Sequence, residues 1–415
     1  MLKRQKCYLL QTINDTSWLL PYGQAVAEQK KGCQLNETGV FIWQTLAQPM
    51  SEPQLIAALA EHYEIDSHDL PALSDDIHTF VRDMLNMGYL REDLTPQGTP
   101  LYRTMQIANL RIGLYGPAEI FPTSFEAFYI ETEASKKTDT SSKGHTLSNK
   151  ESFSDDSDSS NTQSINQKIE AVLTPPSWCP PGNVLIQNRE LTLYENEDMY
   201  RIVFPEMTNI FEARMTKDGH YVRIYCRQPM NEEESDHIFH AIRFFFLYLA
   251  GMHGLFALHS ASILYHGKAW LFSGHSGMGK STHTALWHDL IGTPYLNGDL
   301  NLIGIENGQY QVYGIPWCGT SGIFTTKTYP LGGIVLLGRA SEDHLEPLDD
   351  AEKALRVMQR LISPSWTTDE LKANLAFAAD LSQQIPVYYL CCTKNPSAVD
   401  IIKTAIDKEE ALHHT

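Results

Sequence analysis

Residues 274–281 read Gly-His-Ser-Gly-Met-Gly-Lys-Ser, a complete G-x-x-x-x-G-K-[ST] pattern. A strand-like run over residues 269–272 precedes it, and residues 282–290 can form a helix. Glycines in such a loop let backbone N–H groups face phosphate oxygens, and the helix directs its positive end at them. Lys280 then reaches the β- and γ-phosphates, and the Ser281 hydroxyl ligates Mg²⁺. The pattern therefore predicts a nucleotide-binding loop in an α/β fold, formed by Gly274, His275, Ser276, Gly277, Met278, Gly279, Lys280, Ser281 and Thr282.

Two polar residues flank this loop at comparable distances along the chain. His259 lies twenty-one residues before Lys280, and Asp299 lies nineteen residues after it. Residues 259–272 alternate like a β-hairpin with His266 and Gly267 at its tip, and residues 294–296 read as a further strand leading to Asp299. Strand ends project residues toward such a phosphate site. A base for a hydroxyl proton and a group that orients it are what phosphoryl transfer to a hydroxyl requires, so His259, Lys280 and Asp299 are the candidate catalytic residues.

From about residue 240 onward the chain resembles the HPr kinase/phosphorylase group, whose P-loop fold is related to phosphoenolpyruvate carboxykinase. His259 matches the family's active-site histidine, and Asp299 matches the second, general-base member of its aspartate pair. Gly298 replaces the first aspartate of that pair. The resemblance implies a kinase that uses ATP and Mg²⁺.

The residues that follow read as the rest of this kinase core. Residues 331–338 and 385–390 have the composition of strands, and residues 352–362 and 397–406 that of helices. Residues 316–322 contain Trp317, two glycines and small hydroxyl side chains. They fit a loop that closes over a substrate and equally a turn anchored by a buried tryptophan.

The first hundred residues have a different pattern, three short helices with a β-wing. Residues 18–27 suggest a small hairpin, Asn36 and Ser51 can cap two helices, and a third helix over about residues 70–87 is stopped by Gly88. A strand begins after it at Tyr89. The pattern is that of a winged helix.

Winged helices often bind DNA, but this one lacks the basic stripe that DNA phosphates require. Its third helix carries Asp75, Asp76 and Asp83 against a single Arg82, and the chain has a formal net charge of −18. No nucleic-acid partner is therefore expected. Residues 15–92 instead resemble PqqD-like domains, which recognise the leader of a ribosomally made precursor peptide. The resemblance implies that a leader adds a strand beside the wing and packs on the third helix. Other peptide-maturation enzymes are then possible partners.

Between these halves, residues 132–167 are rich in Ser, Asp, Lys, Thr and Asn and have few apolar side chains. Such a segment buries too little surface to offset its ordering entropy. We predict a disordered insertion, because strand-like residues 105–115 precede it and residues 184–187 and 191–194 follow it. The expected domains are residues 1–97, a kinase domain over 98–131 and 168–410, and the insertion at 132–167.

Composition favours a cytoplasmic enzyme. Hydrophobic residues make up 42% of the 415 positions, and the seven cysteines show no C-x-x-C spacing. No signal-peptide core follows Met1, and the longest apolar stretch, residues 244–258, is too short for a membrane helix and reads as a buried helix leading to His259.

Together these features predict an ATP-dependent kinase of a Ser or Thr hydroxyl on a leader-bearing precursor peptide. A kinase of a small hydroxylated metabolite, a non-catalytic nucleotide-binding peptide-recognition protein and an enzyme that transfers phosphate to water remain open. So does homo-oligomer formation.

Overall fold

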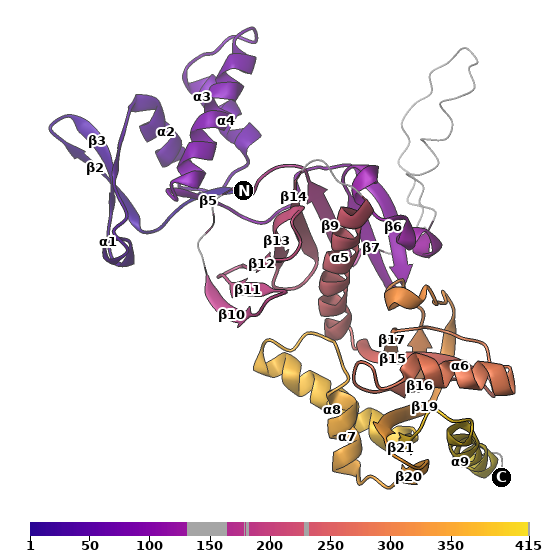
Figure 1. Ribbon diagram of the computed structural model, residues 1–415. Coiled ribbons are helices and arrows are strands. Elements are labelled where there is room, and N and C mark those ends of the chain that lie inside the picture. Colours follow the sequence, from indigo (N-terminus) through magenta and orange to yellow (C-terminus); the bar gives the residue numbers. More distant parts are fainter. Residues whose placement is uncertain (131–163, 178, 180–181, 228–231, 414–415) are drawn as a thin grey trace, which may run out of the picture. The chain divides into compact units, whose positions relative to one another are not determined.

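The computed structural model describes residues 1–130, 164–177, 179, 182–227 and 232–413. It is a mixed α/β structure, as the sequence predicts (Figure 1). The chain forms two compact units. The first unit contains Met1–Gly98, Val172–Lys217 and Arg223–Gln228. The second unit contains Thr99–Ala171, Asp218–Val222 and Pro229–Thr415. Residues 172–217 thus group with the N-terminal residues, whereas the sequence places them in the kinase domain. None of the described helices is long and apolar enough to cross a membrane.

The three N-terminal helices begin where the sequence predicts, and the third also ends there. They are α2 (Glu37–Thr45), α3 (Glu52–His62) and α4 (Leu70–Asn86). The Asn36 side chain accepts a hydrogen bond of 2.8 Å from the Gly39 N–H. Ser51 and Gln54 form a reciprocal capping box. Gly88, with φ 77°, ends the third helix in the left-handed conformation that glycine adopts most readily.

The strands around these helices differ from the sequence prediction at one place. The hairpin expected over residues 18–27 turns earlier, at Asn14 and Asp15, which both have positive φ. Residues 24–27 form a short helix instead, because the second strand ends at Pro21. The elements are β1 (Leu2–Arg4), β2 (Tyr8–Ile13), β3 (Thr16–Pro21), α1 (Gln24–Ala27), β4 (Cys33–Leu35) and β5 (Leu90–Glu92). Strands β2, β3 and β4 form one sheet, in which β4 is an edge, and β1 pairs with β5.

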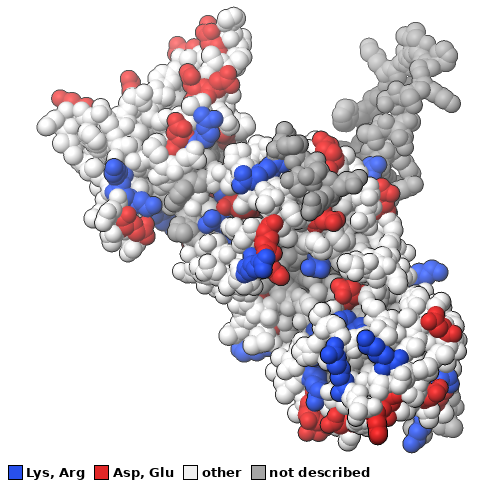
Figure 2. Space-filling model, viewed as in Figure 1, with Lys and Arg blue, Asp and Glu red and all other residues white. Residues whose placement is uncertain are grey.

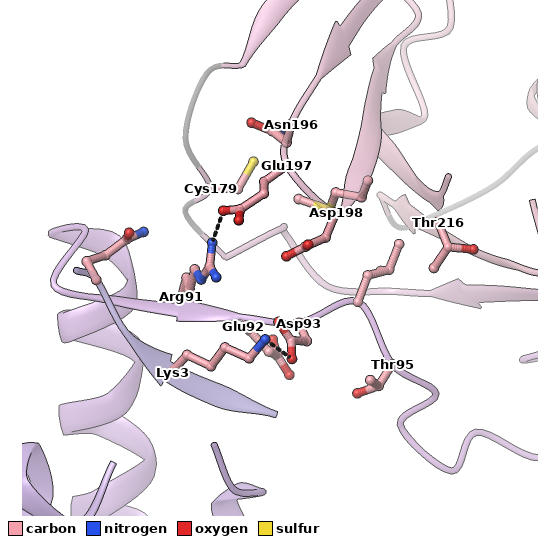
Figure 3. A pocket seen from close by; sticks show the side chains of 13 residues that line it. Lys3, Arg91, Glu92, Asp93, Thr95, Cys179, Asn196, Glu197, Asp198 and Thr216 are labelled. Carbon is pink, nitrogen blue, oxygen red and sulfur yellow. Dashed lines mark hydrogen bonds and ion pairs between the residues drawn. The ribbon is translucent and has the colours of Figure 1, made fainter. Parts of the chain in front are cut away.

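The first unit also contains an antiparallel run of four strands. They are β10 (Asn183–Gln187), β11 (Thr192–Glu195), β12 (Met199–Val203) and β13 (Ile210–Thr216). A cavity of ≈ 610 Å³ lies between β5 and the turn after β11 (Figure 3). Its cations are already paired: Lys3 lies 2.7 Å from Asp93, and Arg91 lies 3.3 Å from Glu197 (Figure 3). We therefore do not regard it as an anion site.

The second unit begins with a hairpin where a single strand is expected over residues 105–115. The chain turns at Ala108, which has φ 52°, because residues 108 and 109 separate two apolar runs. The predicted insertion falls largely on residues outside the described part, and Gln167, its last residue, already belongs to a strand. The elements here are β6 (Leu101–Ile107), β7 (Leu110–Tyr115), β8 (Tyr129–Ile130), β9 (Gln167–Val172) and β14 (Tyr221–Cys226), the last two crossing a unit boundary.

The sheet that carries the glycine-rich loop contains seven strands. They are β15 (Phe256–Tyr265), β16 (Lys268–Ser273), β17 (Leu300–Glu306), β18 (Gln309–Tyr313), β19 (Thr328–Arg339), β20 (His344–Glu346) and β21 (Val387–Cys392). The hairpin of β15 and β16 turns at His266 and Gly267, as predicted. The expected strand at residues 294–296 is wrong: only Tyr295 makes a bridge, to Ile263, while the segment runs irregularly beside β15.

Helices cover both faces of this sheet (Figure 1). Successive residues of β16 point to opposite faces of the sheet. Leu271 packs against α7 and α8 on one face, and Trp270 packs against α6 and α9 on the other. The helices are α5 (Glu232–Met252), α6 (Lys280–Ile291), α7 (Asp350–Met358), α8 (Thr368–Gln384) and α9 (Ser397–His413). Helix α7 ends before the predicted residue 362, and α9 extends past the predicted residue 406. The predicted apolar stretch ends α5 and leads into β15, which carries His259.

Candidate active site

The glycine-rich loop joins β16 to α6, in the strand–loop–helix context that the sequence predicts. Gly277 has φ 72° and Gly279 has φ 102°, a backbone conformation that L side chains rarely adopt. A Cβ at either position would meet no neighbouring atom closer than 4.0 Å. These glycines are therefore explained by the backbone conformation that they adopt and not by crowding. The first N–H groups of α6, next to the loop, have no hydrogen-bond partner within the helix.

The predicted loop residues lie on this connection. His275 and Ser276 are exposed at its tip, and Met278 is half-buried against the core shared with α6. Ser281 and Thr282 are exposed in the first turn of α6. The Ser281 hydroxyl is therefore accessible to solvent at the start of α6.

Two arginines that were not predicted from the sequence contact this loop. The Arg339 guanidinium donates a 2.9 Å hydrogen bond to the Gly277 carbonyl, and that of Arg360 lies 3.1 Å from His275 Nδ1. Figure 2 shows Lys and Arg side chains gathered in the region where Figure 1 places β16 and its neighbours. One signal was available: Arg339 directly follows the apolar run 331–338. The parallel pairing of β19 with β16 brings the carboxyl ends of both strands to one edge.

His259, Asp299 and Lys280 come together beside the loop. The His259 Nε2 lies 3.1 Å from Asp299 Oδ1, and the Ser260 N–H donates to the Asp299 carbonyl at 3.0 Å. The hydrogen bond from His259 is the main cause that lowers the pKa of Asp299, with the charges of Lys280 and Arg243 acting in the same direction against burial. The carboxylate therefore stays ionised at neutral pH and can accept a proton.

The Lys280 ammonium is hydrogen-bonded to the loop, and neighbouring groups shift its pKa in opposite directions. Its Nζ donates to the Gly274 carbonyl at 3.4 Å. Burial lowers the pKa of this ammonium and the nearby Asp299 carboxylate raises it, while Arg360 lowers it further. An anion bound at the loop would relieve this repulsion among the cations.

A buried polar network fixes the backbone on both sides of the His259–Asp299 pair. The Asn301 amide donates to the Ser260 carbonyl at 2.7 Å, and its oxygen accepts from Ser262 at 2.7 Å and from Asn297 at 3.0 Å. The Ser273 hydroxyl donates to the His259 carbonyl at 2.7 Å. Because these groups are satisfied away from water, they hold residues 259–262 and 297–301 in fixed register. Serines alternating on the apolar strand β15 were the sequence signal for it.

The glycine at position 298 has a steric explanation. A Cβ on Gly298 would lie 2.0 Å from Ser321 Oγ, so the loop over residues 316–322 fills that space. Gly319 of the same loop has φ 59°, and a Cβ there would lie 3.0 Å from Asp299 Cβ. Trp317 is only 1% exposed and donates to a carbonyl of α5 at 2.9 Å. The buried-tryptophan turn is thus present, and it also packs against the candidate base.

We expect Gly298→Asp to destabilise the protein by about 1–3 kcal/mol, because the new side chain overlaps Ser321. Combining it with Ser321→Gly should recover much of that loss, since the two positions share one space. Thermal or denaturant unfolding of both variants measures the effect. A single variant as stable as the parent would contradict this account of Gly298.

A second candidate site lies in the N-terminal unit, between α2 and α4. It is a cavity of ≈ 550 Å³ next to the end of the edge strand β4. Its lining is mostly apolar and comprises Asn36, Thr38, Gly39, Ile42, Tyr63, Ile65, Leu73, Asp76, Ile77 and Phe80. Among the described residues, β4 pairs with β3 alone, so its other edge is available to an added strand.

Comparison with known proteins identifies one segment. Residues 25–90 match the family model of coenzyme PQQ synthesis protein D (PqqD), within the range predicted from the sequence. None of the curated proteins matches the chain. Among solved structures, the Hpr(Ser) kinase/phosphatase from Coxiella burnetii aligns over 38% of this chain and 96% of its own, with 10% identity and a TM-score of 0.23.

Proposed function

We propose that this protein is an ATP-dependent kinase that phosphorylates a Ser or Thr hydroxyl of a ribosomally made precursor peptide. The observation that carries the proposal is the His259–Asp299 pair, 3.1 Å apart, beside a glycine-rich loop that bears Lys280. A phosphate cradle, a cation and an ionised carboxylate are the groups that phosphoryl transfer to a hydroxyl requires.

In this proposal the loop from Gly274 to Ser281 binds the nucleotide phosphates through its N–H groups. Lys280, Arg339 and Arg360 offset the negative charge that the phosphates bring. The strand–loop–helix geometry and the exposed Ser281 hydroxyl fit a Mg²⁺–ATP complex. When bound, Mg²⁺ would offset charge on the β- and γ-phosphate oxygens.

Asp299 accepts the proton of the acceptor hydroxyl, and His259 orients the carboxylate. As the hydroxyl oxygen bonds to the γ-phosphorus, the bond from that phosphorus to the β–γ bridging oxygen breaks and ADP leaves. The carboxylate then holds the proton. The 316–322 loop, which packs on Asp299, restricts how the acceptor approaches.

The PqqD match supports a peptide as the acceptor. An extended leader can add to the free edge of β4, where backbone groups supply affinity. The cavity between α2 and α4 starts at Asn36, directly after β4, and can take an apolar leader side chain. The leader would thereby hold the rest of the peptide near the kinase site.

We expect Lys280→Ala to abolish turnover and to weaken nucleotide binding, because the ammonium that would offset the γ-phosphate charge is removed. ATP–Mg²⁺ should raise the unfolding temperature of the parent protein, and a ligand at 100 times its Kd adds about 2.7 kcal/mol of stability. The variant should lose this shift, whereas Lys372→Ala, on the exposed surface of α8, should retain it. Absence of a shift in the parent protein at millimolar ATP would refute nucleotide binding.

A further inference from the structure

A cluster of three metal-binding side chains lies outside the glycine-rich loop, on the edge strand β20 and its neighbour β21. His344 is paired directly with Cys391 across the two antiparallel strands, and Glu346 lies two residues further along β20. Because side chains alternate along a strand, all three lie on one face of the sheet. Their ligand atoms lie within 4.8 Å of one another, and the Cys391 sulfur is 3.3 Å from Glu346 Oε2.

The histidine of this cluster is held in an orientation suited to a ligand. His344 Nδ1 lies 3.1 Å from the Glu342 carbonyl oxygen, which can only accept a hydrogen bond. The tautomer with its proton on Nδ1 satisfies this carbonyl and offers Nε2 to a metal. A backbone carbonyl that fixes the tautomer in this way is the usual outer partner of a metal-bound histidine.

We propose that His344, Glu346 and Cys391 form a zinc site. A thiolate, an imidazole and a carboxylate together favour Zn²⁺ over Mg²⁺, which prefers oxygen ligands alone. Zinc–ligand bonds of about 2.0–2.3 Å require small movements to draw these atoms together. His344 and Glu346 are exposed, so the ion can enter from solvent, and water can take the fourth position. Bound zinc would join the short strand β20 to β21.

Zinc binding should release a proton from Cys391. A thiol is ordinarily protonated at neutral pH, and the thiolate is the form that binds a metal. Formation of the Zn–S bond transfers that proton to the buffer, so zinc affinity should increase with pH.

The test uses the full chain without a polyhistidine tag, stripped with a chelator and kept in excess Mg²⁺. We expect one equivalent of Zn²⁺ to bind by calorimetry, with an apparent enthalpy that changes with the buffer because a proton is released. Co²⁺ in place of Zn²⁺ should give a cobalt–thiolate charge-transfer band. Removing a group that only hydrogen-bonds to a metal ligand typically lowers metal affinity by about 10–100-fold. Cys391→Ser, His344→Gln and Glu346→Gln each remove a ligand and should lower zinc affinity by at least that factor.

The matched control is Cys392→Ala, because Cys392 is the next residue of β21 and packs on the opposite face. It should bind zinc and give the cobalt band like the parent. His344→Gln and Glu346→Gln alter exposed side chains, so their loss of zinc cannot be attributed to unfolding. Stoichiometric zinc retained by Cys391→Ser, no zinc bound by the parent, or no cobalt–thiolate band would each overturn the proposal.

Discussion

Replacing Asp299 with asparagine is expected to lower kcat by about 10²–10⁴-fold while leaving ATP binding near that of the parent. The amide keeps the shape of the side chain but cannot accept the hydroxyl proton, and general-base catalysis contributes in this range. Single-turnover phosphate transfer measures the loss, and the ATP-induced shift in unfolding temperature measures binding. An equal loss of both would indicate a role in nucleotide binding.

The pH dependence gives an independent check on this assignment. Because the hydrogen bond from His259 lowers the pKa of Asp299, the carboxylate remains ionised at neutral pH. Its protonation should reduce the rate only as the pH falls through that lowered pKa, below the usual range of an aspartate. Asp289→Asn, on the exposed surface of α6, is the matched control and should keep the parent rate. A native rate in Asp299→Asn would mean that the base lies elsewhere.

Removal of the leader from the peptide substrate should raise KM by about 10²–10⁴-fold and change kcat little. A tethered leader raises the local concentration of the acceptor without any new contact at the reacting atoms. Steady-state kinetics with full-length and leaderless forms of the precursor peptide measure the effect. Mass spectrometry should find one phosphate on a Ser or Thr outside the leader.

A substitution in the cavity between α2 and α4 tests the same leader interaction from the side of the protein. Thr38→Arg places a long charged side chain in that cavity and should raise KM for the leader-bearing peptide alone, whereas Thr38→Ser should not. The leaderless peptide should be processed equally by all three proteins. Efficient phosphorylation of a small metabolite that is unaffected by Thr38→Arg would assign the protein to the small-molecule kinases.

Sequence could predict the features that depend on neighbouring residues. The caps at Asn36 and Ser51, the stop at Gly88 and the hairpin turn at His266 are all determined within a few positions, and the structure has each of them. The glycine-rich loop belongs to this class as well. Each of these features follows from the physical properties of a few neighbouring residues, so one sequence is enough to predict it.

The missed features depend on residues that are distant in sequence. Nothing near Arg360 indicates that the segment after α7 lies beside His275, and nothing near Ser321 shows that it occupies the space beside Gly298. Residues 294–296 have strand-like side chains, but they make a single bridge, between Tyr295 and Ile263, and otherwise run irregularly beside β15. Tertiary packing overrides local preference at such places.

The parallel pairing of β16 with β19 has a consequence for the order of folding. The hairpin of β15 and β16 closes through neighbouring residues, whereas Leu271 meets Ile334 only after a long stretch of chain has been placed. Contacts of high sequence separation form slowly, because the chain must first lose the entropy of the closed loop. Arg339, at the end of β19, should therefore reach the Gly277 carbonyl only after this long-range pairing has formed.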